Sequence, residues 1–283
     1  MDAGERRGDG RRSDGVTPPL QIRGAALRRD GRELWAGLDL EVQPGELIAV
    51  LGPSGSGKTT LLRAILGLEQ LSEGSVTALG EPVRGAGNRR IGYIPQQRPL
   101  PPETALRARD LVALGVDGHR FGFPLPRRGD RARVDRLLEA VGAGDYADRR
   151  VGELSGGEQQ RLRVGQALAD DPPLLLCDEP LTSLDLANQR AVIGLIDRHR
   201  RATDAAVLFV THDINPVLDR VDRILYIANG RFSLGRPDEV LESATLTRLY
   251  GAPVYVLKAG GRLVVVGAPD AEEHHHHHDE VGA

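Results

Sequence analysis

The chain has 283 residues, of which 40% are hydrophobic, and its formal net charge is -3. That length and apolar content suffice for one large domain or two small ones, and the interspersed charges exclude a strongly basic nucleic-acid-binding surface. The single cysteine, Cys177, excludes an internal disulfide, and no apolar run approaches the roughly 18 to 20 residues needed to cross a bilayer. We therefore expect a cytoplasmic globular protein with no nucleic-acid partner.

The first 42 residues divide into a tail and a pair of strands. Residues 1–19 are rich in charge and glycine, with too few apolar residues to offset the entropy of ordering, so we expect a disordered tail there. From Leu20 onward apolar residues alternate with others, and the pattern is interrupted at Asp30-Gly31. This alternation predicts two antiparallel strands joined at that step.

A glycine-rich stretch, Gly52–Thr59, follows the apolar run Leu47–Leu51 and fits the pattern G-x-x-x-x-G-K-[ST]. A buried strand before such a loop and a helix after it, expected over Thr60–Leu68, favour a phosphate-binding loop over a chance glycine-rich turn. Lys58 would place a charge near the β and γ phosphates of ATP, and the Thr59 hydroxyl would bind Mg²⁺. The predicted nucleotide-binding residues are Gly52, Pro53, Ser54, Gly55, Ser56, Gly57, Lys58, Thr59 and Thr60.

Two short strands, Ser75–Leu79 and Ile91–Ile94, precede a change of composition after Gln97. Beyond that point the chain has proline-rich connections and helical periodicity over Ala108–Leu114 and Arg131–Val141. We interpret residues 97–165 as a helical insertion.

Strand patterns resume in the second half of the chain. Leu174–Cys177 and Ala206–Val210 are apolar runs typical of central parallel strands, and the pattern between them predicts a helix over Ala187–Arg201. Three later features are expected to close the sheet: Ile224–Ile227, the turn at Asn229-Gly230, and Leu263–Val266. The order of elements predicts an α/β fold with a mainly parallel sheet.

Two adjacent carboxylates, Asp178 and Glu179, end the apolar strand at 174–177. At a strand tip beside the phosphate loop, Asp178 would hold Mg²⁺ and Glu179 would polarise the attacking water. The alternative is a solvated acidic pair, which the phosphate loop upstream makes the weaker interpretation.

The segment Leu154–Gln159 resembles the signature motif of ATP-binding cassette (ABC) ATPases, and other pieces resemble that family's motifs in the same order. Gln96 matches the Q-loop, Ser183-Leu184-Asp185 the D-loop, and His212 the switch histidine. The resemblance covers roughly residues 20 to 250 and implies an ABC ATPase core with antiparallel β and helical subdomains. It divides the chain into a tail (1–19), an ATPase domain (20–256) and a C-terminal extension (257–283).

The resemblance also implies roles for residues outside the phosphate loop. Ser155, Gly156 and Gly157 open a helix, whose N-terminal end favours anions; in the family that end meets the γ-phosphate held by a second copy. The implied assembly is a head-to-tail dimer that sandwiches two ATP molecules, with Asp185 also at the nucleotide. His212 is expected to contact the γ-phosphate and orient Glu179, and Gln96 to sense Mg²⁺ and water. The catalytic residues would be Glu179, His212, Gln96 and Lys58, and the Mg²⁺ ligands Thr59, Gln96 and Asp178.

The chain departs from the family pattern where an aromatic residue usually stacks on adenine. Arg28-Arg29 stands at about that position. A guanidinium plane can also stack on a base, so Arg29 is a candidate, and a solvent-exposed hairpin arginine is the equal alternative.

Several features favour a transporter subunit over the family's DNA-acting and ribosome-acting members. Only one set of motifs is present, and no heptads or cysteine pairs lie between the phosphate loop and the signature. Segments 213–217, 238–241 and 249–253 resemble the importer ATPases for zinc, manganese and iron chelates, and 254–266 the extension of the zinc and manganese branch. The resemblance implies integral membrane permease partners that hold the chain at the inner face of the membrane, and an extracellular metal-binding protein. Alternatives are an exporter of drugs or lipids, a siderophore importer, or a non-transport assembly module.

Five consecutive histidines lie near the C-terminus, flanked by carboxylates. Imidazoles at that density bind Zn²⁺ whatever their origin, so the run is either a purification tag or a native metal-responsive tail; its internal position favours the latter. These candidate Zn²⁺ ligands are His274, His275, His276, His277 and His278.

Overall fold

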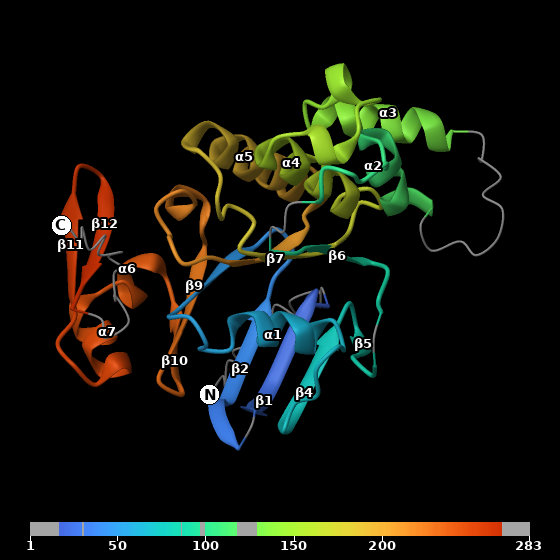
Figure 1. Ribbon diagram of the computed structural model, residues 1–283. Coiled ribbons are helices and arrows are strands. Elements are labelled where there is room, and N and C mark those ends of the chain that lie inside the picture. The colour runs from blue at the N-terminus through green and yellow to red at the C-terminus, as the bar shows by residue number, and fades with distance from the viewer. Residues whose placement is uncertain (1–16, 30, 86, 97–99, 118–128, 268–283) are drawn as a thin grey trace, which may run out of the picture.

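The computed structural model describes residues 17–29, 31–85, 87–96, 100–117 and 129–267, and the fold is given for these residues. The predictions for residues 1–16 and for His274–His278 lie outside them. The described chain forms a six-stranded sheet between two layers, with a small hairpin at the C-terminal end (Figure 1).

The six-stranded sheet has the order β10-β9-β3-β8-β7-β6, and all its neighbours are parallel except β9 and β10. Its strands are β3 (Leu47–Leu51), β6 (Ile91–Ile94), β7 (Leu174–Asp178), β8 (Ala206–Val210), β9 (Arg223–Ala228) and β10 (Arg231–Gly235). Because side chains alternate along a strand, Leu47 and Ala49 join the core on one face, and Ile48 and Val50 the core on the other. Burial on both faces explains the continuous apolar runs.

One face of this sheet is covered by helix α1 (Lys58–Ile65) and a four-stranded antiparallel sheet, with the order β2-β1-β4-β5. Its strands are β1 (Leu20–Arg29), β2 (Arg32–Val42), β4 (Glu73–Ala78) and β5 (Glu81–Pro82). The predicted antiparallel pair at 20–42 is therefore confirmed. Helix α1 begins two residues before the predicted Thr60 and ends before Leu68, because Gly67 adopts φ 71° and cannot continue it.

The opposite face is covered by helices (Figure 1). They are α2 (Ala108–Asp117), α3 (Asp130–Ala140), α4 (Gly156–Ala167) and α5 (Leu186–Thr203), with short 3₁₀ turns η1 (Gly144–Tyr146) and η2 (Val151–Glu153). The helices predicted at 108–114, 131–141 and 187–201 are present, each with slightly different ends. Within α3, Val134 and Leu138 are buried, as a helical period requires.

The C-terminal part corrects one prediction. Leu263–Val266 does not close the main sheet: it lies in β12 (Arg262–Val266), which pairs with β11 (Tyr255–Ala259) in a separate hairpin. The strand β10 holds the edge instead, because the Asn229-Gly230 turn folds it directly back on β9. Between β10 and β11, the helices α6 (Pro237–Val240) and α7 (Ser243–Tyr250) carry the chain away from the edge, whereas the 3₁₀ turn η3 (Leu218–Arg220) lies earlier, between β8 and β9.

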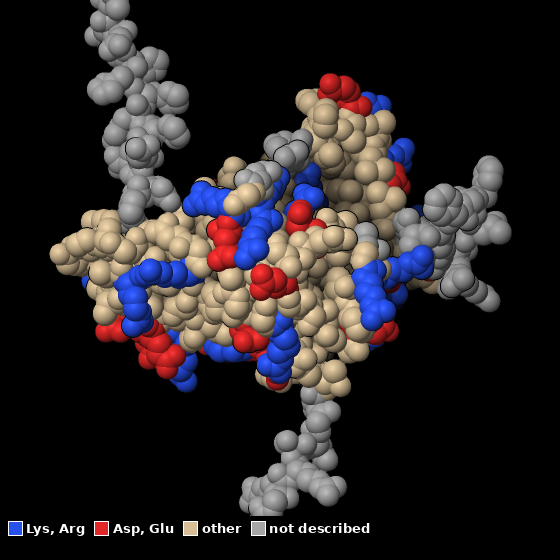
Figure 2. All heavy atoms as spheres, turned by 90° about the horizontal axis from the view of Figure 1, so that it is seen from below, with Lys and Arg blue, Asp and Glu red and all other residues tan. Residues whose placement is uncertain are grey.

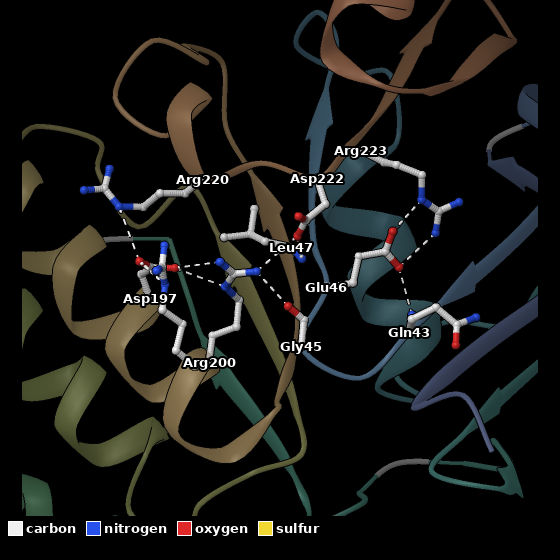
Figure 3. Close-up of polar contacts among 10 residues, drawn as sticks. Gln43, Gly45, Glu46, Leu47, Asp197, Arg200, Arg220, Asp222 and Arg223 are labelled. Atoms are coloured by element: carbon white, nitrogen blue, oxygen red, sulfur yellow. Dashed lines mark hydrogen bonds and ion pairs between the residues drawn. The ribbon is translucent and has the colours of Figure 1, made fainter. Parts of the chain in front are cut away.

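A polar network fastens the amino ends of the parallel strands (Figure 3). The Arg200 guanidinium donates to the Gly45 carbonyl (2.7 Å), to Asp222 (3.1 Å) and to Asp197 (2.9 and 3.1 Å). Asp222 also accepts from the Leu47 N–H at 2.8 Å. Since β3 starts at Leu47 and the glycine-rich loop follows its other end, this network lies at the edge of the sheet opposite that loop.

On the face seen from below, basic and acidic side chains alternate without a large area of one sign (Figure 2). Within the described ranges, no helix has the length and apolarity that a membrane span requires.

Candidate functional site

The glycine-rich loop joins β3 to α1 and has a backbone that larger residues could not copy. Gly52, Gly55 and Gly57 have φ of 142°, 78° and 94°. A β-carbon at Gly52 would lie 2.0 Å from the Ile227 carbonyl oxygen, so the loop can pass only without a side chain there. The loop therefore delivers the first N–H groups of α1 at the carboxyl edge of the sheet, where they suit an anion.

Lys58 is the first residue of α1, and only 6% of it is exposed. Its ammonium donates to the carbonyls of Gly52 (2.7 Å) and Pro53 (2.9 Å), so it lies across the loop. Burial lowers the pKa of Lys58, while the nearby carboxylates of Glu179 and Asp178 act to raise it. A phosphate chain in the loop would meet a desolvated cation.

Thr59 and Asp178 meet at the start of α1. The Thr59 hydroxyl donates to Asp178 Oδ1 at 2.9 Å, and the Tyr93 hydroxyl of β6 donates to Asp178 Oδ2 at 3.3 Å. Burial, and then the charge of Glu179, raise the pKa of Asp178 against the opposing effect of these hydrogen bonds and of Lys58. Burial and Asp178 together raise the pKa of Tyr93 to about 12, so it stays a donor. A hydroxyl and a carboxylate at this distance are hard oxygen ligands that fit Mg²⁺.

Glu179 is the point where the segments that follow β6, β7 and β8 converge. Its Oε2 accepts hydrogen bonds from Gln96 Nε2 (3.1 Å) and from the Thr182 hydroxyl (3.2 Å), and His212 Nδ1 lies 3.8 Å from the same oxygen. Its backbone has φ 48° and donates its N–H to Val210 at the end of β8. The carboxylate is thus held at the carboxyl edge of the sheet, with a glutamine, a hydroxyl and an imidazole around one oxygen.

Two hydrogen-bond partners at the site were not predicted from the sequence: Tyr93, which donates to Asp178, and Thr182, which donates to Glu179. Tyr93 was predicted only as part of a strand. A tyrosine in a strand beside β7, and a threonine three residues after Glu179, are the signals that could have found them, but both residue types are common in such places.

The signature residues lie at the start of α4. Ser155 and Glu158 form a capping box: the Glu158 N–H donates to the Ser155 hydroxyl oxygen (3.3 Å), and the Ser155 N–H donates to the Glu158 carboxylate (2.8 Å). The Ser155 hydroxyl also donates to that carboxylate at 2.8 Å. A β-carbon at Gly157 would lie 2.4 Å from the Asn188 side chain of α5, and Asn188 is held in turn by Asp185, the cap of that helix. The signature and Asp185 are therefore packed together.

A cavity of about 300 Å³ adjoins the glycine-rich loop. Its described lining is Arg29, Leu34, Ser54, Gly55, Gly57, Lys58, Thr59, Thr60 and Glu179. Arg29 thus borders the cavity, whereas Arg28 binds Glu33 and Glu73. Trp35 is fully buried beneath the loop, where a β-carbon at Gly57 would lie 2.8 Å from its indole nitrogen. The lining contains no residue of the signature.

The comparisons with known proteins agree with this arrangement. A family model for the ABC transporter matches residues 35–182. The zinc import ATP-binding protein ZnuC of Chelativorans sp. (strain BNC1) is 34% identical over 87% of this chain and 79% of that protein. The phosphonates import ATP-binding protein PhnC of Anaeromyxobacter dehalogenans (strain 2CP-C) is 38% identical over 83% of this chain, which spans about half (49%) of that relative.

Among solved structures, a dimeric post-hydrolysis state of the ATP-binding cassette MJ0796, bound to ADP and Pi, is similar with a TM-score of 0.66. It is 27% identical, and the match covers 77% of this chain and 98% of that one. Fold, family model and relatives agree with the α/β class expected from the sequence. The chain therefore belongs to the ABC transporter family, as one of its ATP-binding and ATP-hydrolysing subunits.

Proposed function

We propose that this chain hydrolyses ATP to drive an ABC importer, with Glu179 as the residue that orients and deprotonates the attacking water. The observation that supports this role most directly is the convergence of Gln96, Thr182 and His212 on the Glu179 carboxylate. A carboxylate fixed by several donors beside a phosphate loop has a defined direction in which to accept a proton.

The other residues of the site would bind the phosphates, the base and Mg²⁺, and position Glu179. Lys58 and the backbone N–H groups of residues 52–60, Pro53 excepted, hold the phosphates, and Arg29 or Leu34 borders the base. Thr59 and Asp178, with Gln96 close by, would hold Mg²⁺, which when bound neutralises charge on the phosphates. His212 keeps Glu179 in line with the γ-phosphate.

The signature residues favour a dimer. Ser155, Gly156 and Gly157 do not line this chain's own cavity, so we infer that they and Asp185 complete the site of a second copy. The similar cassette MJ0796 is dimeric with ADP and Pi bound. Membrane permease subunits, with the chain peripheral at the inner face of the membrane, and an extracellular binding protein would complete the transporter.

We infer a transition-metal ion, zinc or manganese, as the cargo. Support comes from the zinc import relative and from the resemblance around Asn215 and Tyr250. The phosphonate import relative, at similar identity, makes an oxyanion the second candidate. The predicted Zn²⁺ ligands His274–His278 lie outside the described residues, so only their composition supports a metal cargo.

The deciding experiment is Glu179→Gln in the full-length chain. It keeps the shape but removes the base, so hydrolysis should fall by about 10² or more while Mg²⁺-ATP binding by calorimetry persists. Glu81→Gln, which removes the same charge from exposed β5, is the control and should hydrolyse normally. Near-normal turnover of Glu179→Gln would rule out this role.

The cargo is tested in cells that lack the chain. Radioactive zinc, manganese and phosphonate uptake is measured after complementation with wild type or Glu179→Gln. Metal uptake restored only by wild type supports the metal assignment, and phosphonate uptake restored in the same pattern would replace it.

A further inference from the structure

The C-terminal hairpin is fastened to the loop that carries His212 through the side chain of Asn215. Asn215 Nδ2 donates to the Leu263 carbonyl at 3.0 Å, and the Leu263 N–H donates to Asn215 Oδ1 at 2.8 Å. One amide group therefore satisfies both backbone groups of Leu263, as a neighbouring strand would. We call this two-way contact the Asn215 clasp.

From the clasp, a continuous set of hydrogen bonds leads back to Asp213 and Thr211, the residues on either side of His212. Asp213 Oδ1 accepts from both the N–H (2.9 Å) and the Nδ2 (2.8 Å) of Asn215. The Thr211 hydroxyl donates to the Asp213 carbonyl at 2.8 Å and accepts from the Asp213 N–H at 3.2 Å. His212 lies between these two residues, so its backbone is held on both sides by contacts that end at Asn215.

The hairpin has a second, separate anchor on α7. The Val256 N–H donates to Ser243, and Thr247 bonds both the N–H and the carbonyl of Val254. These contacts hold β11 and the residue before it, whereas the clasp holds β12. A hollow of about 770 Å³, lined by Asp213, Asn215 and the hairpin turn at 260–262 among others, lies beside the clasp. Loss of the clasp would thus loosen β12 without detaching the hairpin.

We propose that Asn215 is a positioning residue, which lets the seating of the C-terminal hairpin set the rate of ATP hydrolysis through His212. Loss of the clasp would lower the turnover rate and leave the affinity for ATP unchanged, since neither the hairpin nor Asn215 lines the cavity beside the phosphate loop. This inference rests on the proposed role of His212 at Glu179.

The test is a double-mutant cycle in the full-length purified chain, with phosphate release measured over a range of ATP concentrations. Asn215→Ala should lower kcat about fivefold and leave KM for ATP within about twofold. His212→Ala should lower kcat by about tenfold or more, and the double variant should match His212→Ala alone. Asn215→Asp, which keeps an acceptor for Leu263 but sets a carboxylate against Asp213, should also lower kcat and serves if the alanine variant does not fold.

Thr247→Val is the matched control, because it removes a two-way contact of the same kind on the same C-terminal segment. Its kcat should stay within about twofold of wild type. Unchanged turnover in His212→Ala would defeat the role of His212 and this inference with it. Low turnover in His212→Ala with normal turnover in Asn215→Ala would overturn the inference alone. An equal further loss in the double variant, or an equal loss in Thr247→Val, would likewise overturn it.

Discussion

Arg200 is expected to contribute strongly to stability and little to hydrolysis. Its side chain is 10% exposed and binds Asp197, Asp222 and the Gly45 carbonyl, which the change Arg200→Met would leave without these donors. Breaking a buried pair by removing one partner costs about 3 to 5 kcal/mol. Asp222 is half exposed and Asp197 keeps Arg201 and Arg220, so we take the lower value, about 3 kcal/mol.

The assay is thermal and urea unfolding followed by circular dichroism, for which about 3 kcal/mol corresponds to a fall in Tm of roughly 6 to 12 °C. Arg201→Met is the control: it also binds Asp197, but its side chain is 68% exposed, so its loss should cost under about 1 kcal/mol. ATP turnover at 25 °C should be normal in both, since the network lies at the opposite edge of the sheet. Equal destabilisation by the two changes, or impaired turnover in folded Arg200→Met, would refute the reasoning.

The network also predicts a pH dependence. Burial acts to raise the pKa of Asp197, but the hydrogen bonds of Arg200 and Arg201 outweigh it and lower the pKa overall. A lowered folded-state pKa means that the stabilisation is complete above the ordinary aspartate pKa of about 4 and is lost as the pH falls through the lower folded value. The difference in the free energy of unfolding between wild type and Arg200→Met should therefore become smaller below about pH 4.

Three further outcomes are expected at the nucleotide site. Ser155→Arg should abolish ATP-dependent dimerisation in light scattering while ATP still binds each subunit; wild-type dimer formation would contradict the shared site. Trp35, the single tryptophan, is buried against the phosphate loop, so its fluorescence should change on ATP addition, and the change should vanish in Lys58→Ala. Tyr93→Phe removes a donor to Asp178 and should raise the Mg²⁺ concentration needed for half-maximal turnover about threefold; an unchanged requirement would leave Tyr93 a purely structural residue.

The parts of the site that could be predicted from sequence are those fixed by short-range rules. The loop at 52–59 and the pair Asp178 and Glu179 follow apolar strands directly, and parallel strands bring their carboxyl ends to one edge. That edge is where Gln96 and His212 also lie. The resemblance to the ABC ATPases was needed to identify Gln96 and His212, and the partners Tyr93 and Thr182 were not predicted.

Contacts between distant segments were harder to foresee. An apolar strand pattern does not say which strand is its partner, so Leu263–Val266 was assigned to the wrong sheet. The Asn215 clasp joins residues 48 positions apart through a side-chain amide, which leaves no periodic trace. The pairing of Arg200 with Gly45 spans 155 positions and is equally invisible in either segment by itself.

The positive φ of Glu179 has a consequence for engineering the stability of this protein. A left-handed conformation at a residue with a side chain costs about 1 kcal/mol, a cost that glycine avoids and asparagine reduces. A search for thermostable variants that scores melting temperature alone would therefore favour replacing Glu179, and under the role proposed for Glu179 the selected variants would be more stable but inactive. Position 179 is where a library selected for heat resistance must be counter-screened for ATP consumption.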